Sequence, residues 1–506
     1  MTATRPRNLL FLWTDEQRPD TIAAYGNPAI RTPHLDRLAG GATLFEAAYC
    51  TAPLCTPSRG SVITGAYPHA HGALRNNVPL PASVPTIAEV LSAEGYACGY
   101  AGKWHLGDEL RAQRGFEAFW SSIEDGYTAD HAGRGFSSYH RWLVAQGYTP
   151  PDVTKEGDRV FSRQTAARLP EAAGKPAFLA AEACRFLDAH GRPGGAPFAL
   201  YVNFLEPHFP LNGPWDDLYP PAAMTLPPSW YVPPDPALPL RYRLRQEGFR
   251  SQNPHVEADD EAGWKGARAR YWGLASLVDK YAGRILERLD ALGLAEDTVV
   301  VYSSDHGDMM GEHRLLAKAM PFDGASRVPL LIRAPGLPAG RVATPVSQID
   351  VVPTVLDLLG FAPPPSAQGA SLRPLLGAGA SAGAARPATD GLAWGEVVVE
   401  WAGTPRGESV SGYRPPADDG SAASEAALRA MAMQQRTIRR GRWKLTVDEG
   451  GEHELYDLET DPGETRNGLA PGHAGAAARA AAAPLWERLR DWQGRTADDL
   501  RLPAPV

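Results

Sequence analysis

The feature that most constrains the fold of this chain is a set of short apolar runs, each followed by a charged residue. The runs are residues 8–14, 96–102, 198–204 and 299–303, and the charged residues beyond them are Asp15, Lys103, His208 and Asp305. Continuous apolar runs of this length are typical of strands buried on both faces of a sheet. Helical patterns separate the runs, so we predict an α/β fold whose mainly parallel sheet lies between layers of helices.

The charged residues that follow these runs indicate where a functional site lies. Parallel strands end at one edge of a sheet, and ligands of open α/β sheets bind outside that carboxyl edge. Ionisable side chains from four distant parts of the chain would therefore meet at the same place. Each residue alone also fits an ordinary surface or packed position, so their convergence carries the argument.

Length and local composition divide the chain into a large and a small part. A chain of 506 residues exceeds what one hydrophobic core usually carries. Residues 377–390 are rich in Ala and Gly and predict a linker. We therefore expect a catalytic α/β domain at 1–376 and a smaller C-terminal α+β subdomain at 391–506. Four short strand patterns predict an antiparallel sheet in the subdomain, followed by a terminal helix over 484–492.

Composition narrows the class of protein. The chain has 43% hydrophobic and 21% charged residues, which is ordinary for a globular protein. Its formal net charge of −8 argues against a nucleic-acid binder, for which a basic face is expected. The first apolar run is too short for a signal peptide, and no run approaches the roughly 18 apolar residues of a membrane span. We therefore expect a cytoplasmic protein without a nucleic-acid or membrane partner.

The stretch at 54–65 places a cysteine directly before a helix. Pro57 suits the first turn of a helix, where its missing N–H has no partner to lose, so the helix should begin near Cys55. Free N–H groups and the helix dipole favour an anion at that end. Arg59, one turn further on, adds a positive charge suited to a tetrahedral oxyanion. The same pattern also fits a buried cysteine that precedes a capped helix.

Two acidic and polar pairs predict a divalent-cation site near this cysteine. Asp15-Glu16 and Asp305-His306 each follow a predicted strand. Carboxylate oxygens suit a hard cation such as Ca²⁺ or Mg²⁺, and one imidazole is compatible with it. Each pair alone also fits a turn at a strand end, so the prediction depends on both pairs lying beside Cys55.

The run Cys55-Thr56-Pro57-Ser58-Arg59 resembles the Cys-x-Pro-Ser-Arg signature of the type I sulfatases, in the alkaline phosphatase superfamily. The resemblance implies an alkaline phosphatase-like fold and oxidation of Cys55 to Cα-formylglycine by a formylglycine-generating enzyme. It also implies one divalent cation, Ca²⁺ in the first place with Mg²⁺ or Mn²⁺ as alternatives. The ligands it implies are Asp15, Glu16, Cys55, Asp305 and His306.

Two of these positions distinguish the chain within the family that it resembles. Sulfatases usually have Asp, Asn or Gln where this chain has Glu16, so Glu16 is a departure that puts its role as a ligand in doubt. His306 is similar to the branch that contains choline sulfatases, iduronate-type sulfatases and phosphonate monoester hydrolases. Asn76 lies where that branch has an Asn that contacts the substrate.

Further motifs extend the resemblance over most of the chain, from Asn8 to about Leu469. The runs Gly102-Lys103-Trp104-His105-Leu106-Gly107 and Glu206-Pro207-His208-Phe209-Pro210 both match family motifs. The substrate-binding residues that the resemblance implies are Asn76, Lys103, His208 and Lys318. The catalytic residues that it implies are Cys55, Arg59, Lys103, His105, His208 and Lys318.

The hypothesis that follows is hydrolysis of a small-molecule sulfate ester. Displacement at sulfur builds negative charge on oxygen, which a pocket of cations stabilises. In the family mechanism one hydroxyl of hydrated formylglycine, bound to the metal, attacks sulfur, and loss of a proton from the second hydroxyl expels sulfate by elimination. We expect His105 to accept that proton as a base. We expect His208 or Lys318 to protonate the leaving alcohol.

Two other functions remain open on the sequence. A phosphonate monoester or phosphodiester hydrolase would use the same nucleophile, although the resemblance implies other residues in place of Lys103 and His105. A catalytically silent member would bind anionic ligands without turnover. The sequence does not choose between an aryl, alkyl, choline or sugar sulfate, and it leaves the oligomeric state open, a homo-oligomer included.

Overall fold

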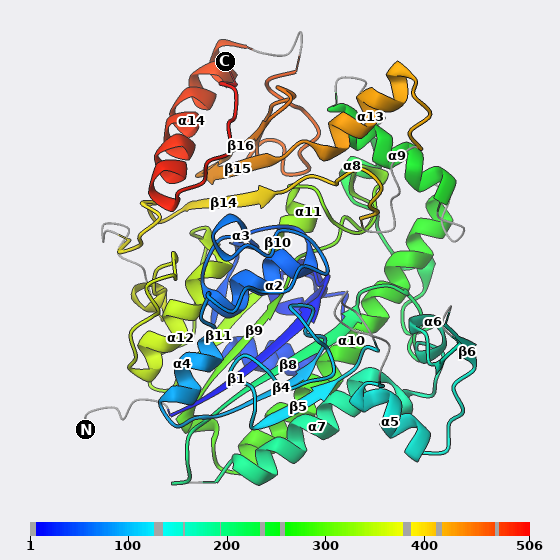
Figure 1. Ribbon diagram of the computed structural model, residues 1–506, viewed down its shortest axis with the longest axis vertical. Helices are drawn as coiled ribbons and strands as arrows, with labels where there is room; N and C mark the ends of the chain where they lie inside the picture. The colour runs from blue at the N-terminus through cyan, green and yellow to red at the C-terminus, as the bar shows by residue number, and fades with distance from the viewer. Residues whose placement is uncertain are drawn as a thin grey trace.

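The computed structural model describes residues 7–125, 135–154, 157–192, 194–232, 238–252, 259–377, 386–410, 417–470 and 475–505. An eight-stranded sheet forms the centre of the larger part of the structure (Figure 1). In spatial order its strands are β12 (Gly340–Val342), β2 (Thr43–Phe45), β11 (Leu330–Arg333), β9 (Thr298–Ser304), β1 (Asn8–Asp15), β8 (Phe198–Pro207), β4 (Ala97–Gly102) and β5 (Phe119–Ser122). The strands from β9 to β5 are parallel to one another, and β11 is antiparallel to β9.

The central strand β1 contributes side chains to two separate cores. Leu9, Phe11 and Trp13 pack on one face, and Leu10 and Leu12 pack on the other, as the two-residue period of a strand requires. The first core includes α2 (Cys55–Thr64), α4 (Ile87–Ala93) and α12 (Val351–Leu359). The second includes α1 (Pro33–Gly40), α7 (Lys175–His190) and α10 (Glu261–Ala291). The predicted α/β sheet between helix layers is confirmed.

A smaller antiparallel sheet lies above α2 in the view of Figure 1. Its strands are β14 (Glu396–Trp401), β15 (Gln435–Arg440), β16 (Trp443–Asp448) and β17 (Glu454–Asp457). The terminal helix α14 (Ala476–Thr496) packs against it. This helix begins earlier than we predicted, because alanine has the highest helix propensity and Pro484 is accommodated inside the helix. Much of the predicted linker, residues 378–385, lies outside the described residues.

The apolar run at residues 328–332 predicts one strand, but the structure divides it in two. Residues 328–332 form the end of β10 (Arg327–Val328) and most of β11, separated at Pro329. Proline has no N–H to give to a ladder, which explains the break. β10 joins β3 (Ala48–Tyr49) and β13 (Val346–Ser347) in a second small sheet.

The remaining α-helices and strands are short. The helices are α3 (Pro68–His71), α5 (Ser138–Ala145), α6 (Arg163–Ala166), α8 (Pro228–Tyr231), α9 (Leu240–Gln252), α11 (Asp323–Ser326) and α13 (Ala422–Ala432). The strands β6 (Asp152–Val153) and β7 (Arg159–Val160) form a two-stranded ribbon. Among the residues that the structure describes, no helix is both long enough and apolar enough to span a bilayer.

Candidate active site

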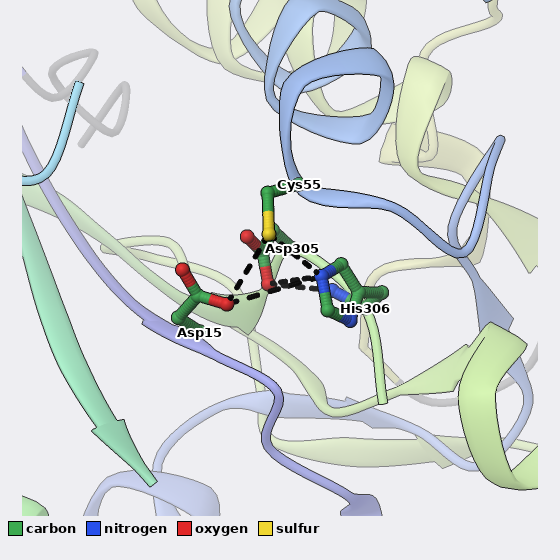
Figure 2. Close-up of side chains that lie close together, drawn as sticks. All are labelled: Asp15, Cys55, Asp305 and His306. Atoms are coloured by element: carbon green, nitrogen blue, oxygen red, sulfur yellow. Dashed lines mark hydrogen bonds and ion pairs between the residues drawn. The ribbon is translucent and has the colours of Figure 1, made fainter. Parts of the chain in front are cut away.

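Two strand ends and a helix N-terminus bring four side chains together. Asp15 ends β1, Cys55 begins α2, and Asp305 and His306 follow β9. One potential ligand atom of each residue lies within 4.8 Å of the others, and all four residues are buried (Figure 2). The Nε2 atom of His306 is 3.3 Å from the sulfur of Cys55 and 3.6 Å from Oδ1 of Asp305. Residues from three distant parts of the chain thus meet at one edge of the sheet.

Backbone pairing between β1 and β9 sets the spacing of the two aspartates. The strands are parallel neighbours, and Thr14 lies opposite Ser304. The N–H of Asp305 donates to the carbonyl of Thr14 at 3.1 Å, and Oδ1 of Asp305 accepts from the N–H of Glu16 at 3.2 Å. Glu16 has a φ of 68°, in the left-handed region, so the chain turns sharply after β1. The adjacent acidic residues Asp15 and Glu16 therefore take different partners.

Arg59 forms ion pairs with both aspartates. Its Nη2 lies 2.9 Å from Oδ2 of Asp15, and its Nε lies 2.9 Å from Oδ2 of Asp305. Its Nη1 donates to Oδ1 of Asn203 at 3.0 Å, and the guanidinium lies 4.8 Å from the ring centre of Trp13. Burial opposes the charge of Arg59, but the two carboxylates outweigh burial and raise its pKa. Arg59 is thus committed to the aspartates, whereas from the sequence we expected it to face an oxyanion.

Lys103 places a second buried cation beside the cysteine. Its Nζ lies 2.6 Å from Oδ2 of Asp15 and 3.7 Å from the sulfur of Cys55. Burial and the carboxylate of Asp15 raise the pKa of the Cys55 thiol despite this lysine. The protein groups alone therefore disfavour a thiolate at neutral pH, and a thiolate is the form in which cysteine acts as a nucleophile.

Glu16 lies with a different set of groups. Its Oε1 is 3.2 Å from Nε2 of His208, and it also forms an ion pair with Nζ of Lys318. Oxygen and nitrogen atoms of Asp15, Glu16 and His208 form a second potential ligand group, while Glu16 is not in the group around Cys55. Burial lowers the pKa of His208 to about 3 and that of Lys318 to about 8. His208 and Lys318, which the sequence predicted at separate positions, therefore meet at one carboxylate.

Lys318 is supported from the C-terminal sheet through α9. Arg245 of α9 donates from Nη1 to the carbonyl of Lys318 at 2.8 Å. One turn earlier on the same helix, Arg241 forms ion pairs with Asp448 of β16 at 2.8 Å and Glu454 of β17 at 2.6 Å. Both arginines are buried. Through α9, the small sheet is thus connected to the backbone of Lys318.

Two further predicted site residues contact Thr56, the residue after Cys55. Oδ1 of Asn76 accepts from the N–H of Thr56 at 3.1 Å, so Asn76 holds the first turn of α2. The carbonyl of His105 accepts from the Thr56 hydroxyl at 2.8 Å. Burial and the charge of Lys103 lower the pKa of His105 well below its usual value. The described contacts of Asn76 are therefore with the helix.

Several buried polar residues of the site were not predicted from the sequence. Asn203 lies inside the apolar run of β8, and its side chain is a partner of Arg59. A lone amide in such a run is a signal that could have identified it. Gln348 accepts a hydrogen bond from Ser58 at 3.0 Å, and Glu109 contacts the Lys103–His105 turn. The run Gln348-Ile349-Asp350 fits the type I sulfatases as framework without indicating a contact with Ser58, and nothing in the local pattern distinguishes Glu109 from a solvent-exposed residue.

Comparison with known proteins assigns the family. A family model described as Sulfatase matches residues 7–361, more than half of the chain. The chain belongs to the sulfatase family of hydrolases. Its resemblance to type I sulfatases, first indicated by the run from Cys55 to Arg59, is thereby confirmed.

Individual relatives support the same assignment, and a solved structure shows the same fold. The chain is 30% identical over 384 residues to an ulvan-active sulfatase of Formosa agariphila, covering 74% of this chain and 65% of that protein. It is 30% identical over 488 residues to a choline-sulfatase of Rhizobium meliloti, covering 92% and 83%. This sulfatase-family chain therefore spans slightly less than two thirds of the first relative's length. A phosphonate monoester hydrolase from Silicibacter pomeroyi has a TM-score of 0.74 at 24% identity over 99% of both chains, which confirms the alkaline phosphatase-like fold.

The donor set around Cys55 fits a divalent cation. It offers two buried carboxylates and one imidazole from Asp15, Asp305 and His306, in addition to residue 55. Hard cations such as Ca²⁺, Mg²⁺ and Mn²⁺ favour carboxylate oxygens. Two carboxylates at such short range also repel each other, and a cation between them would offset that repulsion. The residues present therefore fit a divalent cation.

Proposed function

We propose that the protein hydrolyses a sulfate ester and that residue 55, as Cα-formylglycine, provides the nucleophile. One observation carries the proposal. The sulfur of Cys55, in a chain of the sulfatase family, lies 3.3 Å from His306 Nε2 and 3.7 Å from both Asp15 Oδ1 and Lys103 Nζ. An oxygen in place of this sulfur would lie between cation ligands and a lysine, where developing negative charge is stabilised.

The cation site consists of Asp15, Asp305, His306 and residue 55, with Glu16 as a further candidate ligand. Ca²⁺ is the first candidate because Asp15 and Asp305 are oxygen donors and the oxidised, hydrated residue 55 would add a third, and Mg²⁺ and Mn²⁺ are alternatives. A bound cation would lower the pKa of a nucleophilic hydroxyl and neutralise charge on the transferred group.

Oxidised residue 55 supplies, once hydrated, one hydroxyl that attacks sulfur and a second whose deprotonation expels sulfate. Lys103 would neutralise charge on the sulfuryl oxygens, since its Nζ lies within 3.7 Å of the sulfur of Cys55. His208 or Lys318 would give a proton to the alcohol as the bond between sulfur and the ester oxygen breaks. His105 would take the proton of the second hydroxyl as sulfate leaves. A water molecule then restores the hydrate, so the products are the alcohol and sulfate.

The maturation step is tested directly by mass spectrometry. We expect the peptide that contains residue 55 to carry an aldehyde when the protein is produced with a formylglycine-generating enzyme. An unmodified thiol in active protein would contradict the proposed nucleophile. An unmodified thiol in inactive protein that still binds sulfate would support the silent, anion-binding alternative.

Turnover of an aryl sulfate tests the nucleophile. Cys55→Ala should lower kcat by about 10⁴–10⁶-fold, the range found when a catalytic nucleophile is removed. Cys98→Ala is a matched control, because Cys98 is buried in β4 and lies in the hydrophobic core. Comparable turnover by wild type and Cys55→Ala would refute the covalent route.

Phosphonate monoester or phosphodiester hydrolysis is the second candidate. It is supported by His306 and Asn76, which resemble the branch that contains the phosphonate hydrolases, and by Cys55 as a shared nucleophile. Lys103 and His105 favour sulfate instead. Measuring kcat/KM for an aryl sulfate and the matching aryl phosphonate on aldehyde-containing protein decides between the two. We expect the larger value for the sulfate.

A further inference from the structure

The turn that carries Lys103 and His105 is hydrogen-bonded to the helix that begins with Cys55. The carbonyl of Lys103 accepts from Nη1 of Arg59 at 2.6 Å and from the hydroxyl of Tyr100 at 2.6 Å. The carbonyl of His105 accepts from the hydroxyl of Thr56, the second residue of α2. Both ends of this turn are therefore held in register with α2 through their carbonyl oxygens.

Glu109 holds the same turn through its N–H groups. Its Oε2 accepts from the N–H of Trp104 at 2.9 Å, and its Oε1 accepts from the N–H of His105 at 2.6 Å. The two carboxylate oxygens thus bind two consecutive peptide groups. His105 has a φ of 61°, a left-handed conformation that a non-glycine residue keeps only where its surroundings impose it. The Glu109 carboxylate is well placed to impose it.

The surroundings of Glu109 show that packing alone does not explain a carboxylate there. Its side chain is buried, and its backbone carbonyl accepts from Nε1 of Trp120, whose ring packs with those of Tyr100 and Trp104. Burial raises its pKa to about 7 even though it accepts two peptide hydrogen bonds. An apolar side chain would avoid this desolvation, but it would leave two buried N–H groups without an acceptor.

We propose that Glu109 is a positioning residue for catalysis: its carboxylate, together with the Thr56 hydroxyl, fixes the turn at 103–105 so that His105 is oriented toward residue 55. This inference rests on the proposed function, because it assigns His105 to the release of sulfate. It also gives a role to Thr56, the variable residue of the Cys-x-Pro-Ser-Arg signature. Glu109 itself touches neither the substrate nor the reacting atoms.

Glu109→Gln is the variant that separates positioning from packing. Gln has nearly the same shape, but only one of its two terminal atoms accepts a hydrogen bond, so one N–H of the pair would face an amide NH₂. Glu89→Gln is the matched control. Glu89 caps α4 through the N–H of Thr86 and pairs with Arg114, outside the site.

The kinetic readout is a comparison of the two half-reactions on an aryl sulfate. For Glu109→Gln we expect kcat to fall by about 10–100-fold, and KM to fall with it so that kcat/KM changes little, because support is lost for a group that acts in the second half-reaction. Release of the first equivalent of phenol should slow much less than steady-state turnover, because His105 acts after the alcohol has left. Equal slowing of both phases, or full activity, would overturn the proposal. Glu89→Gln should match the wild type.

A readout independent of activity is the amide spectrum of protein labelled with ¹⁵N at histidine and tryptophan. Hydrogen bonds to a carboxylate shift amide protons downfield, so the Trp104 and His105 resonances should move upfield in Glu109→Gln and stay in place in Glu89→Gln. Resonances that do not move would refute the proposed role of the hydrogen bonds from the Trp104 and His105 N–H groups to Glu109. If aldehyde-containing wild type turns over no sulfate ester, the proposed function fails, and this spectrum still decides whether Glu109 holds the turn.

Thr56→Val provides a second, milder variant in case Glu109→Gln does not fold. It keeps the branched shape and removes only the hydroxyl that binds the His105 carbonyl. We expect kcat to fall by about 10-fold with the same bias toward the second half-reaction. Unchanged kinetics in Thr56→Val would contradict the inference that the register between this turn and α2 matters.

Discussion

The Nε atom of Arg59 lies 2.9 Å from Oδ2 of Asp305, and neither side chain is exposed to solvent. The other arm of the same guanidinium reaches Asp15 at the same distance. One arginine therefore holds two carboxylates of like charge close together at the sheet edge. The fold itself, before any cation is bound, supplies part of the positive charge that this edge needs.

Replacing this arginine should destabilise the fold. For Arg59→Met we expect a loss of about 3–5 kcal/mol in the free energy of unfolding, because two buried carboxylates lose their partner. Urea denaturation in the presence of a chelator measures the effect. Arg341→Met, which removes a pair with Glu46 that is half exposed, should cost less than about 1 kcal/mol. Similar costs for the two variants would contradict our account of Arg59.

Cation binding should stabilise the wild type in a way that depends on Asp305. A free Ca²⁺ concentration 100 times the dissociation constant should raise the free energy of unfolding by about 2.7 kcal/mol. Asp305→Asn should abolish this gain. Asp357→Asn should retain it, because Asp357 lies outside the cluster around Cys55 and contacts Arg373 and Ser371. Thermal denaturation across a Ca²⁺ titration provides the measurement, and an equal gain in all three proteins would exclude Asp305 as a ligand.

The contact between α1 and α10 should contribute to the pH dependence of stability. Asp279 accepts from the N–H of Leu35 at 2.7 Å, and burial raises its pKa to about 7. The folded state therefore binds a proton that the unfolded state releases near pH 4, so this contribution is complete below that pH and is lost as pH rises through 7. Relative to Asp279→Asn, the wild type should lose about 3 kcal/mol between pH 5 and pH 8. A difference that does not vary with pH in urea denaturation would refute this assignment.

Close packing along α2 should make Gly60 intolerant of a side chain. A Cβ atom at Gly60 would lie 2.5 Å from the imidazole of His71, which itself lies 3.0 Å from the carbonyl of Pro57. We expect Gly60→Ala to cost about 1–3 kcal/mol through overpacking. Gly494→Ala, in α14 with open space around it, should instead stabilise the protein by about 0.5–1 kcal/mol. Thermal denaturation compares the two, and equal effects would contradict the role of this contact.

How far the sequence could predict the structure depended on the range of the interactions. Buried strands such as β1 and β9 were predictable because continuous apolar runs report burial directly, and the polar residues after them marked the site edge. The terminal helix α14 was underestimated because Pro484 outweighed the high propensity of the alanines before it. Pro329 divided a predicted strand for a reason that the sequence did contain.

Within the site, the sequence predicted residue types better than their partners. It brought Asp15, Cys55 and Asp305 to one place, but it did not show that Arg59 would bind the aspartates. Nor did it predict that Glu16 and Asp15 have different partners, because this difference depends on the left-handed backbone conformation of Glu16. The support from Glu109 was also hidden, since a carboxylate that accepts peptide N–H groups has no periodic signature.

The connection between the small sheet and Lys318 affects how this protein can be re-engineered. It leads from Asp448 and Glu454 to Arg241, and along α9 to Arg245, which contacts Lys318. The small sheet is part of the framework around Lys318, although it lies in the last quarter of the chain. Grafting a relative's C-terminal portion onto this chain would change the anchorage of Lys318 unless α9 travelled with the graft. Exchange between family members should therefore treat α9 and the small sheet as one inherited unit.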